Sequence, residues 1–389
     1  MNYILFDDAT REQLLPLTFT RPVCDIRIGI LTIREKWEMI LKEKTSTATE
    51  EYLSKKFPLK IAENNLWING SVCPDSNLVA EIKALSDGQR LVSEEKILAV
   101  CQSGSAEVDL KNTEGIEYTQ ELLSVEHPWE VFAKNGEALK RDFETITEGR
   151  TSEPISDSNT IFGSGEIFFE KGAKAEAVIF NTENGSIYIG KNAEVMEGSI
   201  IRGPFSLGEE SIVKMGAKIY GPTTVGPHSR VGGEVNNSVI MGYSNKGHDG
   251  FLGNSVLGEW CNIGADTNNS NLKNNYDEVR VWSYGEKRFA KTGLQFCGLI
   301  MGDHSKSGIN TMFNTGTVVG VSANIFGGGF PRTFIPSFSW GGAAGFSEYK
   351  PEKAFDTAQR VMERRGKQLD EVEKNILLTI YELTKSYRN

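Results

Sequence analysis

An aliphatic residue recurs at every sixth position through the middle of the 389-residue chain. Small or polar residues fill most of the intervening positions, and glycine directly follows several of the aliphatic residues. A six-residue period of this kind indicates a parallel β-helix, in which each short strand sends one aliphatic side chain inward and successive coils stack those side chains. The unbroken series is Ile189, Val195, Ile201, Leu207, Val213, Ile219, Val225 and Val231.

The same period continues less regularly on both sides of this series. Residues 271–292 fit no hexad, so we expect them to leave the β-helix as a loop excursion, and loops on rigid scaffolds often carry function. These repeats resemble the left-handed β-helix family, and that resemblance alone implies the handedness. The expected continuation is Ile161, Ile167, Ala173 and Ile179 upstream, Val239, Phe251, Leu257 and Ile263 after a shift of two, and Met301, Ser307, Phe313, Val319 and Ile325 beyond the excursion.

The segments outside the repeats differ in composition. Short apolar runs alternate with helical patterns in residues 1–144, which indicates a small α/β domain, and the acidic, Ser- and Thr-rich stretch 145–160 is typical of a linker. The β-helix is expected over 161–335. Apolar residues three to four apart over 351–387 predict one or two terminal helices that cover the last coil. The predicted fold is therefore mainly β with α/β: a C-terminal left-handed parallel β-helix, a small N-terminal domain and C-terminal helices.

Charge and cysteine content narrow the possible functions. The net charge of −10 argues against a nucleic-acid or anionic-membrane partner and favours small molecules. The first residues lack the basic region of a signal peptide, and no apolar run reaches membrane-spanning length, so we expect a cytoplasmic protein. Five scattered cysteines without a Cys-x-x-Cys pair predict neither disulfides nor a zinc ribbon, and the sequence suggests no metal ligands.

The chain has only four histidines, and one of them lies in an informative stretch. His248 belongs to Lys-Gly-His-Asp-Gly-Phe-Leu-Gly (246–253), which is followed by Leu-Gly, then by Asn-Ile-Gly-Ala (262–265) and by Asn271. From Ile201 to Thr292 this spacing resembles, without a gap, the acetyltransferase half of the GlmU-like family of bifunctional N-acetylglucosamine-1-phosphate uridylyltransferases and glucosamine-1-phosphate N-acetyltransferases. The resemblance implies N-acetyl transfer from acetyl-CoA to an amino sugar phosphate, glucosamine 1-phosphate in that family.

The resemblance also implies a role for each matched residue. His248 is the expected general base, because histidine has an unperturbed pKa of about 6.5 and can accept the amine proton near neutral pH. Asn271 falls on the active-site asparagine, whose amide orients the substrate or donates to the developing oxyanion. Ala265 matches an alanine whose backbone faces acetyl-CoA. The residues expected to bind the sugar phosphate are Lys218, Glu234, Asn262, Phe251 and Arg202.

Two positions depart from the family pattern. Asn236 stands where the family has a phosphate-binding lysine, and Phe251 stands where it has a tyrosine, so the phosphate is recognised by fewer groups. The excursion carries cations that either bind phosphates, with Arg288 assigned to acetyl-CoA, or form a solvated loop. His304, which follows the excursion, is an alternative base. The cations are Arg280, Lys287, Arg288 and Lys291.

The N-terminal domain resembles the start of sugar nucleotidyltransferases, most of all the bacteroidete-type branch of the same bifunctional family. The Gly-x-Gly-x-Arg phosphate loop of those enzymes is replaced by residues 7–11, Asp-Asp-Ala-Thr-Arg, which keep the backbone farther from a triphosphate. Arg11 and Arg21 are the expected nucleotide-binding residues, whereas Asp25 and Arg27 equally fit a structural ion pair. The resemblance implies UTP as a substrate and Mg²⁺ as a cofactor, without assigning a Mg²⁺ site.

Three other functions fit parts of the sequence. A γ-type carbonic anhydrase shares the β-helix but needs three convergent histidines. His228, His248 and His304 lie 20 and 56 residues apart, which argues against this function. A nucleotidyltransferase could use the β-helix for oligomer assembly alone, and a scaffold protein would have no turnover. The family resemblance implies a homotrimer, with contact surface expected from Phe296, Phe330, Phe334 and Trp340.

Overall fold

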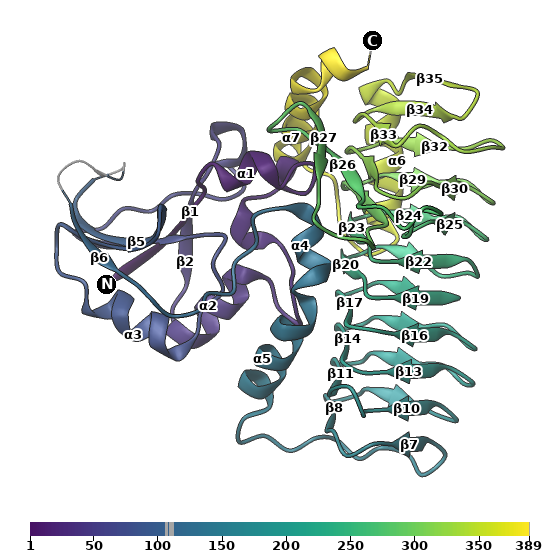
Figure 1. Cartoon of the computed structure of the whole chain (residues 1–389), viewed down its shortest axis with the longest axis horizontal. Helices are drawn as coiled ribbons and strands as arrows, with labels where there is room; N and C mark the ends of the chain where they lie inside the picture. The colour runs from purple at the N-terminus through teal and green to yellow at the C-terminus, as the bar shows by residue number, and fades with distance from the viewer. Residues whose placement is uncertain (106–107, 109–112, 389) are drawn as a thin grey trace.

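The computed structural model describes residues 1–105, 108 and 113–388. From residue 160 the chain winds into a three-sided parallel β-helix (Figure 1). The first face contains β7 (Thr160–Phe162), β10 (Ile179–Asn181), β13 (Ile200–Arg202), β16 (Lys218–Tyr220), β19 (Glu234–Asn236) and β22 (Phe251–Gly253). The strands β25 (Asn268–Asn269) and β30 (Met312–Phe313) prolong this face.

The other two faces complete the coils, and the prediction of a left-handed parallel β-helix beside a small α/β domain is confirmed. The second face contains β8 (Ile167–Phe169), β11 (Ile187–Ile189), β14 (Phe205–Leu207), β17 (Thr223–Val225), β20 (Val239–Gly242), β23 (Val256–Glu259), β28 (Leu299–Met301), β31 (Thr317–Val319) and β33 (Phe334–Ile335). The third contains β9 (Lys174–Ala175), β12 (Glu194–Val195), β15 (Ile212–Val213), β18 (Arg230–Val231), β21 (Asn245–Lys246), β24 (Asn262–Ile263), β29 (Lys306–Ser307), β32 (Asn324–Ile325), β34 (Ser339–Gly342) and β35 (Gly345–Glu348).

The central series from Ile189 to Val231 is buried inside the coils, as its period predicts. The expected frame is wrong at three positions, where the residue that points into the coils is the next one along the chain. Val239 is buried too, but outside the coils, in the cluster shared with the N-terminal domain. Val231 and Val235 are only four residues apart on successive faces, so the turns between strands vary in length. A shift of one residue turns a strand side chain to the opposite face. Buried Phe180, Ile240 and Leu252 therefore replace the predicted Ile179, Val239 and Phe251.

The N-terminal domain is a six-stranded sheet in the order β2-β1-β3-β5-β4-β6. Its parallel β1, β2 and β3 are followed by helices, as the alternating pattern predicts. The strands are β1 (Asn2–Phe6), β2 (Thr45–Ala48), β3 (Asn64–Asn69), β4 (Gln89–Ser93), β5 (Lys96–Ser103) and β6 (Glu114–Glu117). The helices are α1 (Thr10–Gln13), α2 (Ile33–Leu41), α3 (Ser76–Ala84), α4 (Pro128–Ala133) and α5 (Asn135–Thr147), with 3-10 turns at Leu17–Phe19, Val23–Asp25 and Glu51–Leu53.

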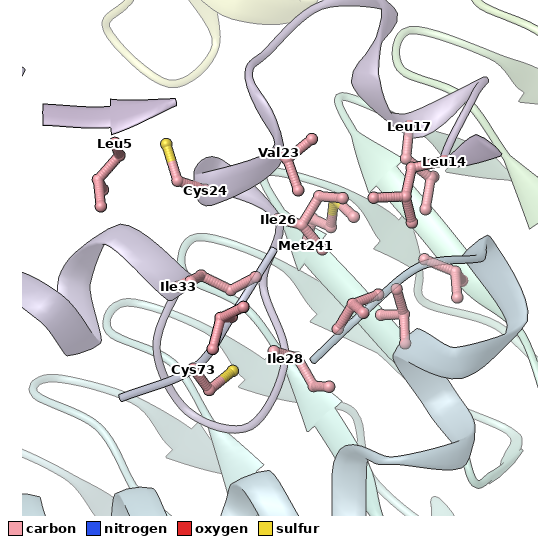
Figure 2. Packing of buried hydrophobic residues seen from close by; sticks show 14 of the residues in the cluster. Leu5, Leu14, Leu17, Val23, Cys24, Ile26, Ile28, Ile33, Cys73 and Met241 are labelled. Atoms are coloured by element: carbon pink, nitrogen blue, oxygen red, sulfur yellow. The ribbon is translucent and has the colours of Figure 1, made fainter. Parts of the chain in front are cut away.

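This domain packs against the outer side of the second face, with α4 and α5 lying along it (Figure 1). Figure 2 shows Met241 of the second face among Ile26 and Ile28 of the N-terminal domain, within one continuous hydrophobic cluster. The Thr224 hydroxyl donates to the Gly29 carbonyl at 2.9 Å. The helix α5 ends at Thr147, inside the segment expected to be a linker.

The excursion folds into a hairpin of β26 (Arg280–Ser283) and β27 (Arg288–Lys291), and two helices follow the last coil. Trp282 of the hairpin stacks on Phe334 with ring centroids 4.4 Å apart, so Phe334 is not free contact surface. Tyr284 meets Phe19 of the N-terminal domain edge-on at 5.2 Å. The terminal helices are α6 (Pro351–Glu363) and α7 (Glu371–Leu383), with a final 3-10 turn at Lys385–Tyr387.

Candidate functional site

A cleft of about 710 Å³ lies between the third face of the β-helix and the C-terminal end of α6. His248, Asn262 and Ala265, which the sequence assigned to one site, all line this cleft. Asn245 and Asn262 are register neighbours on β21 and β24, and His248 lies in the turn that leaves β21. Stacked coils therefore bring the predicted residues to one wall.

The cleft has a strongly basic lining. Among its described lining residues there is no aspartate or glutamate, and five are cationic. Arg230 and Lys306 belong to the outer stripe of the third face, where Arg230, Asn245, Asn262 and Lys306 follow one another in register. The five cations are Lys214, Arg230, Lys306, Arg364 and Arg365.

Burial lowers the pKa of three of these cations, and a neighbouring arginine adds to the effect at Arg230 and Arg365. Burial lowers the pKa of Lys306 to about 8. Burial and then the charge of Arg365 lower the pKa of Arg230, and burial followed by Arg364 does the same for Arg365. A cavity that gathers cations without acidic partners is suited to an anionic ligand, and arginine forks favour phosphate.

None of the five cations of the cleft was predicted from the sequence, and Arg364 and Arg365 come from a helix far along the chain. The guanidinium of Arg365 donates to the side-chain oxygen of Asn245 at 3.3 Å, which ties the end of α6 to the third face. The only sequence signal was a run of basic residues at the end of the predicted helix, and its destination depends on how that helix docks. No local pattern encodes that docking.

Three of the residues expected to bind the sugar phosphate lie on the outer side of the first face, whereas Asn262 lies on the third. Lys218, Glu234 and Phe251 are successive register partners on β16, β19 and β22. The Lys218 ammonium lies 3.6 Å from the Glu234 carboxylate, which also accepts a hydrogen bond from the Tyr220 hydroxyl at 2.7 Å. This stripe begins directly after the His248 turn, because that turn joins β21 of the third face to β22 of the first.

Two other predicted residues, Asn271 and Arg202, have polar partners that do not belong to the cleft lining. The Asn271 amide donates to the Asn254 side chain at 2.7 Å, after β22, at the edge where the first face meets the second. Its nitrogen lies 2.8 Å from where a Cβ at Gly253 would be, a point that the Phe251 ring also approaches. Arg202, on β13, faces Glu183 at 3.4 Å. Neither Asn271 nor Arg202 is among the residues that line the described cleft.

Arg288 and His304 also lie outside the cleft lining. The Arg288 guanidinium pairs with Glu286 at 2.6 Å, on the hairpin that packs against the N-terminal domain. His304 stacks on Trp260, which stacks on Tyr243 and so continues to His228. Burial lowers the pKa of His304 well below its ordinary value, and its Nδ1 has no hydrogen-bond partner among the described residues. This environment suits a neutral structural ring.

The two arginines predicted to bind nucleotide are both buried and engaged. Arg21 donates to Asp303 and lies 3.3 Å from Glu259, so it connects the N-terminal domain to the β-helix. Arg11 donates to the Thr18 carbonyl at 2.9 Å and to the Tyr52 hydroxyl at 2.6 Å. Their assignment to nucleotide phosphates stays a prediction. The other expected structural pair is also different, because Asp25 pairs with Arg34 rather than with Arg27.

A second cavity, of about 530 Å³, lies in the N-terminal domain where β1 and β2 end. Its lining is mostly apolar and includes Phe6 and Trp67, with Asp7 and Asp8 beside them. Burial raises the pKa of Asp7 to about 6, against hydrogen bonds from Thr49 and the Val23 backbone. The carboxyl ends of parallel strands are where ligands commonly bind in open α/β sheets.

Within residues 1–105, 108 and 113–388, no group of three or more His, Cys, Asp or Glu side chains is arranged to hold a metal ion. Across that same part of the chain, no helix is long and apolar enough to cross a membrane. His228, His248 and His304 do not converge on one cavity, as a carbonic-anhydrase site would require.

Comparisons with known proteins follow the same division of the chain. Residues 3–151 match a family model described as sugar nucleotidyl transferase. A bifunctional sugar-1-phosphate nucleotidylyltransferase/acetyltransferase of Sulfurisphaera tokodaii is 34% identical over 146 residues, which are 37% of this chain and 36% of that protein. The bifunctional protein GlmU of Methanocaldococcus jannaschii is 37% identical over 22% of this chain and 21% of its own length. The chain therefore matches less than half the length of these relatives, and the resemblance to GlmU-like proteins is confirmed.

Two solved structures are also similar to part of this chain. The polySia specific acetyltransferase NeuO is 16% identical, with 50% of this chain and 87% of that chain covered at a TM-score of 0.29. An Arabidopsis UDP-N-acetylglucosamine acyltransferase is 13% identical, with 60% of this chain and 91% of that chain covered, also at 0.29.

Proposed function

We propose that the protein is an acetyl-CoA-dependent N-acetyltransferase that acts on an amino sugar phosphate, with glucosamine 1-phosphate as the acceptor. The observation that carries this proposal is the basic cleft, where His248, Asn262 and Ala265 share one cavity with five cations. Acetyl-CoA supplies an activated acyl group, which an amine can attack with the help of a base, and several phosphates, which cations can bind.

In this proposal His248 accepts a proton from the sugar amine as the amine attacks the thioester carbonyl. The carbon–sulfur bond then breaks, and CoA leaves as its thiol. Lys306, Arg364 and Arg365 would meet the CoA phosphates, in place of Arg288. The Lys218–Glu234–Phe251 stripe lies on the other side of the His248 turn and would hold the sugar phosphate, with Lys218 as its cation.

We also propose a homotrimer, because Asn271 is not among the residues that line the cleft of one chain. The outer side of the second and third coils exposes Ile179 and Ile200, which are 37% and 42% exposed, and Met215 and Ile309 are both 69% exposed. Large apolar side chains exposed beside a candidate site favour coverage by a second copy. Light scattering at micromolar concentration tests this, and a clean monomer would contradict it.

The N-terminal domain carries a second proposed activity, the transfer of a nucleotidyl group between UTP and a sugar 1-phosphate. Its support is the family match over residues 3–151 together with the cavity beside Asp7 and Asp8. Mg²⁺ would neutralise the triphosphate, and Asp7, Asp8 and Glu95 are the acidic groups that line this cavity. Calorimetry with UTP and with UDP-N-acetylglucosamine, with and without Mg²⁺, tests the proposal, and absence of heat in every case would refute it.

The acetyltransferase proposal is tested by incubating the protein with acetyl-CoA and glucosamine 1-phosphate and following the release of free thiol. His248→Ala should lower kcat by roughly 10²- to 10⁴-fold with little change in KM. His127→Ala, in the N-terminal domain, is the matched control and should retain activity. Loss of activity in His304→Ala with full activity in His248→Ala would show that the base is misassigned. No thiol release by the unaltered protein would leave the nucleotidyltransferase alternative, with the β-helix serving oligomer assembly.

A further inference from the structure

Lys246 occupies a position where the β-helix otherwise places aliphatic side chains. On the third face, Val213, Val231 and Lys246 are successive inward-facing register partners, and Ile263 follows in the next coil. The lysine is only 2% exposed. Burial lowers the pKa of its ammonium to about 8, although the nearby carboxylates of Asp249 and Asp266 favour the charged form. A buried cation at an aliphatic position destabilises the coil, so its presence calls for a compensating role.

The ammonium of Lys246 is committed to the turn that carries His248. Its Nζ donates to the His248 main-chain carbonyl at 2.6 Å. Asn245, Gly247 and His248 all line the cleft, whereas Lys246 is absent from the described lining. The lysine therefore lies behind the wall of the cleft and holds that wall from the inside of the coil, where it does not contact a ligand.

The neighbouring coils hold the same turn from below and above. A Cβ at Gly233 would lie 2.7 Å from the His248 carbonyl oxygen, so the absence of a side chain lets the turn settle closely on the coil below. In the coil above, the Asp266 amide donates to the Asp249 carbonyl at 2.9 Å. These contacts fix the turn along the axis of the β-helix, and Lys246 fixes it across that axis.

We propose that Lys246 is a positioning residue that locks the 247–250 turn and so aims the His248 side chain into the cleft. The effect on acetyl transfer rests on the proposed function, whereas the effect on the turn does not. If position 246 served stability alone, an aliphatic side chain like those above and below it would stabilise the coil more than lysine does. Lys246→Ile should therefore separate the two roles, because it should stabilise the coil while it releases the turn.

The experiment compares the full-length protein with Lys246→Ile, and with Lys246→Met in case the branched side chain does not fit. Val231→Ile is the matched control, because it changes the next inward position of the same stripe without touching the turn. Thermal unfolding should show an unchanged or higher Tm for the Lys246 variants. The kcat of thiol release should fall about 10-fold or more, with the KM values for acetyl-CoA and glucosamine 1-phosphate within about twofold of the wild type.

A second measurement reports on the turn without any turnover. In protein labelled at its four histidines, the His248 ring signal, assigned with His248→Ala, should shift and sharpen in both Lys246 variants and stay unchanged in Val231→Ile. An unchanged His248 signal in a folded Lys246 variant would overturn the inference. So would unchanged kcat in an active protein. If the wild type releases no thiol, the proposed function fails, and the ring signal still decides whether Lys246 fixes the turn.

Discussion

Replacing Arg21 with methionine should destabilise the whole protein, because this arginine links two distant parts of the chain. Its side chain is buried and donates to Asp303, which lies 282 residues along the chain on a coil of the β-helix. Asp303 is buried too, and it also accepts hydrogen bonds from the Thr20 hydroxyl at 2.7 Å and the Glu259 amide at 2.9 Å. Methionine keeps most of the volume of the arginine stem and removes only its charge and donors.

The expected magnitude follows from the burial of both partners. Removing one member of a buried ion pair typically costs about 3–5 kcal/mol, because the other charge is left without a partner. At roughly 2.1 cal/mol/K per residue, cooperative unfolding of 389 residues has an entropy near 0.8 kcal/mol/K. The Tm should therefore fall by about 4–6 °C in Arg21→Met.

Differential scanning calorimetry at pH 7.5 measures this change against two comparisons. Arg21→Met combined with Asp303→Asn should lose less stability than the sum of the single changes, because no buried charge is then left alone. Lys191→Ala breaks an exposed pair with Glu209 at 3.5 Å and should change stability by less than about 1 kcal/mol. A Tm for Arg21→Met within about 1 °C of the wild type would refute the linking role, and loss of UTP binding at unchanged Tm would instead favour the nucleotide assignment.

Three further predictions concern single buried groups. The pKa of Asp7 is raised from 3.8 to about 6 in the folded protein, so between about pH 4 and 6 the folded state binds a proton that the unfolded chain has released. The contribution of Asp7 to the free energy of unfolding therefore falls as the pH rises through this range. In urea titrations, the free energy of unfolding of Asp7→Asn relative to the wild type should rise by up to about 3 kcal/mol between pH 4 and 7. Buried His304 stays neutral while the unfolded chain binds a proton below about pH 6.5, so the wild type should lose more Tm than His304→Phe between pH 7.5 and 5, and equal losses would contradict this. Gly233→Ala should lower the Tm and shift the His248 ring signal, because residue 233 has φ +69° and a Cβ there would meet the His248 carbonyl. A variant with the Tm and the ring signal of the wild type would contradict the close packing of this turn.

The sequence predicted the parts of this structure that depend on local repetition. The six-residue period located the coils, and the family resemblance assigned His248, Asn262 and Ala265 to one site, where successive coils stack them along one wall. The period could not predict shortened turns, so the predicted frame was wrong at Val239 and Phe251. It also could not show that a lysine occupies the inward position at 246, where the neighbouring coils have aliphatic residues.

Contacts between distant segments could not be predicted from the sequence for a different reason. Arg364 and Arg365 reach the cleft only because α6 docks beside the third face, and Arg21 meets Asp303 only because the N-terminal domain docks on the second. The positions of such partners are set by packing of whole elements, which leaves no periodic trace in either segment. Arginines that resembled phosphate ligands by position therefore turned out to be engaged in the fold.

The hydrophobic cluster shared by the N-terminal domain and the second face affects how the coils open. An isolated solenoid can unwind from either end, one repeat at a time, because each coil touches only its neighbours. Here the middle and later coils pack against the N-terminal domain, the hairpin and the terminal helices. The first two coils contact α5 through Phe168 and Tyr188, whereas the first face of the first coil leaves Ile161 48% exposed and Phe162 52% exposed. Unwinding should thus begin at the coil nearest residue 160 and stop before it reaches the coils that carry the cleft. The site would then stay assembled while the first coil unfolds locally and refolds.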